Sequence, residues 1–209
     1  MIDQEAHWSE RYRQAGDEYL FGIAPCRFLE THRVLFAAGA TALSVADGEG
    51  RNSVWLAEQG LQVRALEISP VALEKARKLA RGRAVEVDFV QCDVVADPWP
   101  TDTYDFVVGM FIQFVGPAQR QVQFARMKQA TAAGGLLLLH GYTPKQLEYR
   151  TGGPSTVENL YTAELLQEAF GDFEILELRE YEDTLNEGHG HKGRSAVIDL
   201  VARRPLQPR

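Results

Sequence analysis

The segment ALSVADGEGRNSVWLAEQG, residues 42–60, joins an apolar run to an amphipathic segment through the turn Asp47-Gly48-Glu49-Gly50. An apolar run that ends in glycines and then changes to helical spacing predicts a buried strand, a tight turn and a helix. Glycines in such a turn leave the backbone N–H groups at the start of the helix open to a ligand. A tight turn without a ligand is the alternative, because the pattern is short.

On both sides of this segment, short apolar runs alternate with helical spacing, which predicts βαβ units and a largely parallel sheet. Strands are predicted at residues 41–47, 61–67, 84–93, 104–114, 136–142, 173–181 and 195–204. Helices are predicted at 52–59, after Ser69-Pro70, from 116 to about 132, and at 162–170. The last two strands, joined by the short connection 182–194, are expected to be antiparallel to each other. Residues 143–160 are predicted to be a loop long enough to suggest function.

The composition narrows the class of protein and of partner. A chain of 209 residues, 45% apolar and 24% charged, fits one globular domain. Its net charge of −7 disfavours nucleic acid and anionic membranes, which require a basic face, and favours a small-molecule partner. The two cysteines are too few for a disulfide framework or a zinc site, and no secretory signal or long apolar run occurs. We expect a soluble cytoplasmic protein without a bound metal, either a monomer or a homodimer.

Carboxylates follow the next two predicted strands. The glycine turn does not match the dinucleotide fingerprint G-x-G-x-x-G or a phosphate loop. Glu67 closes the second strand, where a carboxylate can accept hydrogen bonds from both hydroxyls of a ribose. Asp93 ends the third, where a carboxylate can reach an adenine amino group. Solvated strand caps are the alternative for each. Because ligands of open α/β sheets bind at the carboxyl ends of strands, the three features together predict a nucleoside site.

These residues resemble those of the class I S-adenosylmethionine-dependent methyltransferases over about residues 5–204. Within that superfamily the chain looks closest to the small bacterial tellurite-resistance and thiopurine methyltransferase-like enzymes. The resemblance is carried by DGEGRNSVWLAEQG, LEIS, QCDV, AAGGLLLLHGYTP, TGGP and EGHGHKGR, in that order. It implies a Rossmann-like, doubly wound, three-layer α/β/α fold whose seven strands follow the order 3-2-1-4-5-7-6, with strand 7 antiparallel.

The resemblance also implies a single methyltransferase domain, residues 1–209, whose segments have different roles. Residues 1–40 would form N-terminal helices and a lid over the cofactor, and 41–142 the cofactor-binding half. Residues 143–204 would form the substrate-side half, followed by a tail at 205–209. The implied cofactor is S-adenosyl-L-methionine, and the implied partner is a small-molecule methyl acceptor.

The chain departs from the family's pattern at several positions. Ser44 stands where the first motif has an aspartate, and Ala46 where it has its first glycine. Asp47 is a hypothetical replacement for the missing carboxylate. His140 stands where an acidic residue is expected in this subgroup, and Gln113 where a histidine is common.

The resemblance implies a set of site residues at the carboxyl ends of the strands and in the late segments. The expected cofactor-binding residues are Tyr19, Ala46, Asp47, Gly48, Gly50, Arg51, Asn52, Glu67, Ile68, Cys92, Asp93, Val94, Met110 and Gln113. The expected catalytic residues are His191, His140, Tyr142 and Arg194. His191 stands inside the family-like pattern EGxxHxG, whereas His189 is more typical of a solvated loop.

Three functional hypotheses follow. The leading one is methyl transfer to a soft nucleophile, either a thiol, which ionises readily beside a positive group, or a selenium or tellurium oxyanion, which needs no base. The second is an O- or N-methyltransferase of a small metabolite, with His140 or His191 as general base. The third is an S-adenosylmethionine-binding protein without catalysis, motivated by Ser44, Ala46 and Gln113.

Overall fold

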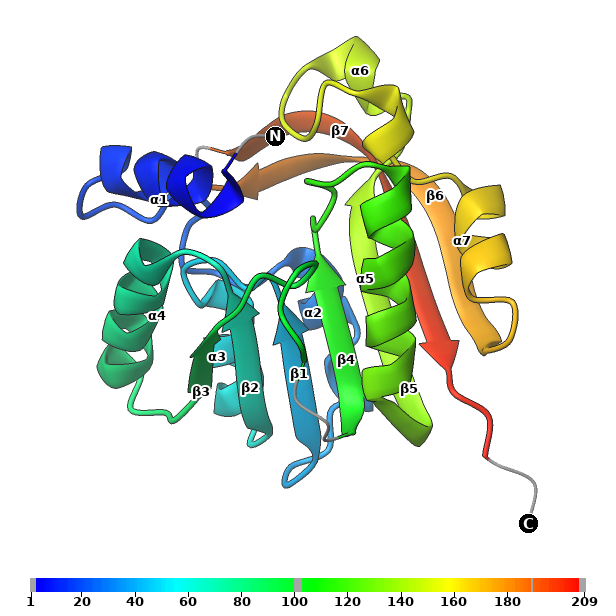
Figure 1. Cartoon of the computed structure of the whole chain (residues 1–209), viewed down its shortest axis with the longest axis horizontal. Helices are drawn as coiled ribbons and strands as arrows, with labels where there is room; N and C mark the ends of the chain where they lie inside the picture. Colours follow the sequence, from blue (N-terminus) through cyan, green and yellow to red (C-terminus); the bar gives the residue numbers. More distant parts are fainter. Residues whose placement is uncertain (1–2, 100–102, 189, 207–209) are drawn as a thin grey trace. The chain divides into compact units, whose positions relative to one another are not determined.

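The computed structural model describes residues 3–99, 103–188 and 190–206, which fall into two compact units (Figure 1). Unit 1 comprises Met1–Trp99 and Glu187–Gly190, and unit 2 comprises Pro100–Asn186 and His191–Arg209. His189 and the last three residues of the expected tail lie outside the described residues.

The strands form a seven-stranded sheet in the order β3-β2-β1-β4-β5-β7-β6. Their bounds are β1 Thr41–Val45, β2 Gln62–Glu67, β3 Asp88–Gln91, β4 Tyr104–Met110, β5 Thr131–Tyr142, β6 Glu174–Glu187 and β7 His191–Arg203. The pairs β1–β2, β2–β3 and β4–β5 are parallel, whereas β5 and β7 are antiparallel. The predicted fold class, strand order and direction of strand 7 are confirmed.

Side-chain caps begin two of the helices of unit 1 that the structure describes, the first and the last. The helices of this unit are α1 Gln4–Gln14, α2 Arg27–Thr31, the 3-10 turn η1 Arg33–Leu35, α3 Arg51–Glu58 and α4 Pro70–Gly82. At the start of α4, the Ser69 hydroxyl accepts a hydrogen bond from the N–H of Ala72, and Pro70 occupies the first turn. The helix α3 packs on β1 and β2, and α4 packs on β2 and β3.

The helices of unit 2 are α5 Pro117–Ala130, α6 Gln146–Tyr149, the 3-10 turn η2 Val157–Asn159 and α7 Ala163–Ala169. The helix α5 packs on β4 and β5 (Figure 1). It ends directly in β5, because Thr131 already has extended backbone angles and its hydroxyl donates to the carbonyl of Met127. The predicted loop 143–160 contains two short helical segments, α6 and η2. No helix among the described residues is long and apolar enough to cross a membrane.

The predicted extent of the last two strands is wrong. β6 runs on to Glu187 and β7 begins at His191. The polar run 182–187 lacks the apolar alternation of a half-buried strand, but backbone pairing can extend an exposed ribbon without it. His191 and Arg194 therefore lie on a strand and not in a loop. Three positions apart on a strand, they face opposite sides.

Candidate functional site

The turn between β1 and α3 needs its two glycines. Gly48 and Gly50 adopt positive φ angles of 66° and 89°. A Cβ atom on Gly48 would lie 2.9 Å from the Tyr12 hydroxyl, and one on Gly50 would lie 2.8 Å from the Cβ of Ala76. Ala46 adopts a φ of 51° despite its methyl group, which costs about 1–2 kcal/mol. Ala46, which stands where the family's motif has its first glycine, thus keeps the left-handed backbone conformation that a glycine adopts without strain.

The Asp47 side chain holds this turn together through hydrogen bonds. Its carboxylate accepts hydrogen bonds from the Ser44 hydroxyl at 2.7 Å, from the Ser53 N–H at 3.2 Å and from the Ser53 hydroxyl. Burial raises the pKa of Asp47, and the bonds from Ser53 and Ser44 oppose that rise. The Asp47 carboxylate thus contacts Ser44, the position at which the family's first motif has an aspartate.

Glu67, the last residue of β2, connects the glycine turn to the start of α4. One carboxylate oxygen accepts from the Gly48 N–H and the other from the Ser69 N–H, both at 2.8 Å. The side chain is buried, and burial raises its pKa to about 7 although both backbone donors favour the charged form. Each carboxylate oxygen can accept more than one hydrogen bond, so Glu67 retains capacity for a ligand's hydroxyl groups.

Glu49 and Lys75 form a buried ion pair beside the same turn, with 2.6 Å between carboxylate oxygen and amine. The amine also donates to the backbone carbonyls of Tyr12 at 3.3 Å and Glu18 at 2.6 Å. The second carboxylate oxygen of Glu49 is buried and has no hydrogen-bond partner in the described part of the chain. A buried acceptor of this kind fits a ligand's ammonium or hydroxyl group. Glu49 was not among the expected site residues, although a charged side chain within the glycine turn was a signal for a ligand contact.

Three of the other expected cofactor residues hold chain segments together within unit 1. The Arg51 guanidinium pairs with Glu187 at 2.7 Å, and both side chains are buried. The Asn52 side-chain oxygen accepts from the Cys26 N–H at 2.8 Å. Tyr19 packs against the apolar face of α4 and donates its hydroxyl to the carbonyl of Lys75 at 3.1 Å.

Of the remaining expected cofactor residues, Cys92, Asp93 and Val94 follow β3, and Ile68 follows β2. Cys92 and Val94 are buried, whereas Ile68 and Asp93 are partly exposed. One oxygen of Asp93 accepts from the N–H groups of Val95 at 2.8 Å and the next residue, Ala96, at 3.1 Å. Asp93 therefore caps a turn in this structure.

In unit 2, Phe111 lies at the centre of an aromatic cluster with His140, Tyr142 and His191, here called the ring cluster. The centroid of the Phe111 ring lies 4.6 Å from that of His140, 4.8 Å from Tyr142 and 4.0 Å from His191. Phe111 follows β4 with a φ of 58°, and its N–H donates to the His140 carbonyl at 2.8 Å. The structure thus gathers three of the four expected catalytic residues. Phe111 was missed because it reads as part of an apolar strand.

Arg194 does not join the ring cluster. Its side chain is 67% exposed and donates to Glu182 at 3.0 and 2.6 Å. The guanidinium lies 5.0 Å from the ring centroid of Tyr149, and Lys145 pairs with the same carboxylate. Arg194 therefore belongs to an exposed polar network.

Gln113 and Met110 lie near the end of β4. The Gln113 amide donates to the carbonyls of Tyr142 at 2.8 Å and Asn159 at 3.3 Å, and it accepts from the Tyr142 N–H at 2.5 Å. These bonds engage the amide with backbone groups at the end of β5. Met110 is buried and pairs in register with His140.

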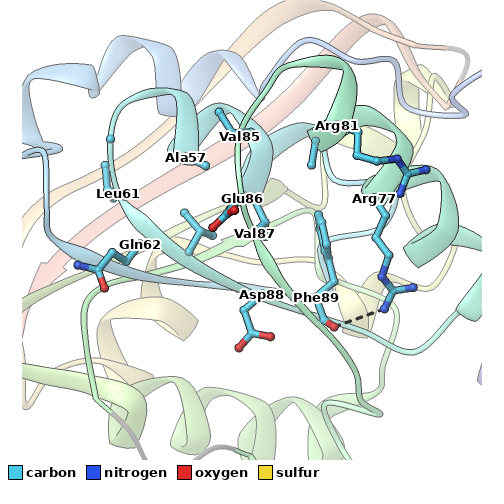
Figure 2. Close-up of a pocket in the computed structure, with 13 residues that line it drawn as sticks. Ala57, Leu61, Gln62, Arg77, Arg81, Val85, Glu86, Val87, Asp88 and Phe89 are labelled. Atoms are coloured by element: carbon cyan, nitrogen blue, oxygen red, sulfur yellow. Dashed lines mark hydrogen bonds between the residues drawn. The ribbon is translucent and has the colours of Figure 1, made fainter.

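A cavity of about 750 Å³ in unit 1 has no part in this site (Figure 2). Its wall includes Gln62 and Asp88, the first residues of β2 and β3, together with Arg77 and Phe89. It lies at the amino ends of these strands, whereas Glu67 and the glycine turn lie at the carboxyl ends. Among the described residues, no group of three or more His, Cys, Asp or Glu side chains could hold a metal ion.

The strand order, the antiparallel β7 and the glycine turn define a Rossmann-like fold of the methyltransferase type. Residues 42–135 match a family model described as a methyltransferase domain, and this range contains the glycine turn and Glu67. The expected class is thus supported by fold and by sequence.

The chain is similar to demethylmenaquinone methyltransferase of Thermus thermophilus, with 30% identity over 104 residues, 49% of this chain and 47% of that protein. The chain spans about half the length of the curated relatives it matches. Its fold is similar to a structure described under "Conversion of a Disulfide Bond into a Thioacetal Group during Echinomycin Biosynthesis", with a TM-score of 0.77, 16% identity, and coverage of 98% of this chain and 93% of that one. It is also similar to TehB from Haemophilus influenzae, with a TM-score of 0.72, 19% identity, and coverage of 96% and 66%. The two structural likenesses show the fold.

Proposed function

We propose that this protein transfers a methyl group from S-adenosylmethionine to a small molecule. The methyltransferase family match and the fold support this class and its cofactor. The observation that carries the proposal is the hydrogen bond from the Gly48 N–H to the Glu67 carboxylate, because a carboxylate beside the glycine turn is suited to accept hydrogen bonds from a ribose.

The residues around the turn fit the cofactor. Glu67 would accept from the ribose hydroxyls, and the unpartnered oxygen of Glu49 would accept from the ammonium group. Asp93 would reach the adenine amino group. The Tyr12 hydroxyl of α1 lies against Gly48, which supports residues 1–40 as a cover over this site. When bound, the cofactor would supply a sulfonium methyl group, whose carbon an acceptor's electron pair attacks in line while the electrons of the broken C–S bond return to sulfur, which leaves as a thioether.

For the acceptor, we propose a soft nucleophile, with a thiol first. The ring cluster supports it, because sulfur packs favourably against aromatic rings and imidazole groups favour a thiolate. Exclusion of water by these buried rings would sharpen alignment of the acceptor. The tellurite-resistance and thiopurine methyltransferase-like subgroup, with selenium or tellurium acceptors, is the finer form of this proposal.

A second candidate is an O- or N-methyltransferase of a small metabolite. The observation that favours it is a buried hydrogen bond between His140 and Asp199, an arrangement suited to a general base. A panel of labelled-cofactor reactions with a thiol, a phenol, an amine and tellurite distinguishes the two candidates. Transfer only to oxygen or nitrogen would overturn the soft-nucleophile proposal.

Calorimetric titration with S-adenosylhomocysteine tests the cofactor proposal. We expect Glu67→Gln to raise the Kd about 10- to 100-fold, because a charged acceptor of the ribose hydroxyls is lost. The control is Glu58→Gln. In the wild type, the partly exposed Glu58 side chain on α3 pairs with Arg83 at 3.4 Å. Equal affinity in all three proteins would show that the ribose binds elsewhere.

A further inference from the structure

The antiparallel register of β5 and β7 places His140 directly opposite Asp199. The His140 Nδ1 atom lies 2.5 Å from a carboxylate oxygen of Asp199, and the two side chains are only 2% exposed. Neighbouring strands of a sheet hold such opposite residues within contact distance. A carboxylate taken out of water without a partner would be costly, so this bond is a strong local constraint.

The other oxygen of Asp199 is also held. The Arg179 guanidinium on β6 lies 3.6 Å from it, and the Tyr181 hydroxyl donates a hydrogen bond to the carboxylate. Burial, and next the charge of Asp199, raise the pKa of Tyr181, so this hydroxyl remains a donor. Arg179 in turn lies 4.3 Å from the centroid of the Tyr181 ring. The carboxylate is therefore fixed from β5 on one side and from β6 on the other.

A carboxylate at Nδ1 determines the form of an imidazole. It accepts the Nδ1 proton, which leaves Nε2 as the basic atom, and it stabilises the imidazolium that forms when Nε2 takes up a proton. We propose that Asp199 is a positioning residue that holds His140 as the general base for the methyl acceptor. This inference rests on the methyltransferase function proposed above and specifies its acceptor class.

The proton of a thiol or phenol acceptor moves to Nε2 of His140, the electron pair of the broken X–H bond forms the new bond to the methyl carbon, and the electron pair of the C–S bond stays on the cofactor's sulfur. For an amine, the nitrogen lone pair forms the new bond and Nε2 takes up the N–H proton. The imidazolium later releases its proton to water. The acceptor's reacting atom thus carries a proton at neutral pH, as in a thiol, a phenol or an amine. A tellurium or selenium oxyanion, which is already ionised, would not need this pair of residues.

Several charged or titratable groups lie around the imidazole. Besides Asp199, Arg179 and Tyr181, they include His191 on β7, whose ring contacts the same Phe111. The Phe111 ring stands roughly perpendicular to the His140 imidazole, with an angle of 87° between the two ring planes. The positive φ of Phe111 is unusual for a bulky residue and is consistent with a held, strained position.

Nitrogen-15 NMR of the histidine rings tests the inference without any acceptor. We expect His140 in the wild-type protein to carry its proton on Nδ1, with Nε2 unprotonated, and Asp199→Asn to abolish this preference. His140→Gln assigns the signals. Glu174→Gln, which removes an exposed carboxylate on β6 paired with Arg203 at 3.2 Å, is the matched control and should change nothing. A wild-type His140 protonated on Nε2 would overturn the inference, even if Asp199→Asn failed to fold.

Kinetics provide the second test, with labelled S-adenosylmethionine and three probes: the alkyl thiol 2-mercaptoethanol, phenol and tellurite. We expect His140→Gln and Asp199→Asn to lower kcat about 10²- to 10⁴-fold for the proton-bearing acceptor. Asp199→Asn should also move the acid limb of the pH profile, whereas the Kd for S-adenosylhomocysteine stays unchanged. Transfer to tellurite alone, an unchanged pH profile, or a protein that binds S-adenosylhomocysteine but methylates none of the probes would overturn the general-base role. Failure of the wild-type protein to bind S-adenosylhomocysteine would instead overturn the proposed function, and the NMR result would still decide the pairing.

Discussion

Burial controls the chemistry of single residues around the glycine turn. Glu67 is held by two backbone N–H groups, yet desolvation outweighs them and raises its pKa to about 7. The same competition occurs at Asp47, where burial also exceeds the effect of the bonds from Ser53 and Ser44. These carboxylates are therefore groups that a ligand's donors can shift back toward the charged form.

The raised pKa of Glu67 predicts a loss of stability as pH rises. Between its ordinary value of 4.5 and about 7, the folded chain retains a proton that the unfolded chain has already released. The stability contribution is thus fully present below pH 4.5 and is lost by about pH 7, a change of about 3 kcal/mol. Urea unfolding at pH 5 and pH 8 measures it.

The control is Glu67→Gln, which cannot titrate. We expect the free energy of unfolding of the wild type to fall by more than that of Glu67→Gln between the two pH values. Parallel pH dependence in both proteins would mean that Glu67 titrates normally in the folded chain.

At the level of elements, the turn after β6 is tied to the start of α3. The Glu187 carboxylate bonds the Arg51 guanidinium at 2.7 Å and the Arg27 N–H at 3.1 Å. Its neighbour Gly188 adopts a φ of 70°, where a Cβ atom would lie 2.4 Å from the backbone of Gly22. The close approach of the two backbones at Gly22 and Gly188 thus requires glycine. The buried ion pair between Glu187 and Arg51 holds the two segments together beside it.

We expect Glu187→Gln to lower the free energy of unfolding by roughly 2–4 kcal/mol, because it leaves the buried Arg51 cation without its counter-charge. The matched control is Glu174→Gln, which breaks an exposed pair with Arg203 and should cost about 0–1 kcal/mol. Chemical unfolding of both variants measures the difference. Similar values for the two would show that the buried pair contributes no more than a surface pair.

For the whole molecule, the proposed cofactor site should couple ligand binding to global stability. A ligand that binds only the folded chain stabilises it in proportion to the logarithm of its concentration. The glycine turn, Glu67 and Lys75 connect β1, β2, α4 and the end of α1, so the ligand would bind to a set of elements that must all be folded.

We expect S-adenosylhomocysteine at about 100 times its Kd to raise the free energy of unfolding by about 2.7 kcal/mol. For a chain of this size the Tm should rise by roughly 5–10 °C. Differential scanning fluorimetry over a range of concentrations measures it. ATP, which shares the adenosine but carries phosphates, is the control and should have little effect, because the two cations beside this turn, Arg51 and Lys75, are already paired with Glu187 and Glu49. A Tm that responds equally to both would indicate recognition of adenosine alone.

The sequence by itself determined the fold class and the cofactor half of the candidate site. Local rules were sufficient there, because the glycines at 48 and 50 and the capping pair Ser69-Pro70 act within a few residues of the chain. The apolar runs likewise predicted the parallel strands, since burial on both faces leaves a continuous apolar pattern.

Only the tertiary structure decided how the expected catalytic residues are arranged. His140 and Asp199 meet because of the register of β5 and β7, and a shift by one residue would have sent them to opposite faces. Arg194 and His191 face opposite sides of β7, three positions apart on one strand. The polar sequence does not reveal that the strand extends to these residues. Which side chains share a site across distant strands depends on pairing and burial, and these are properties of the folded sheet that no short segment contains.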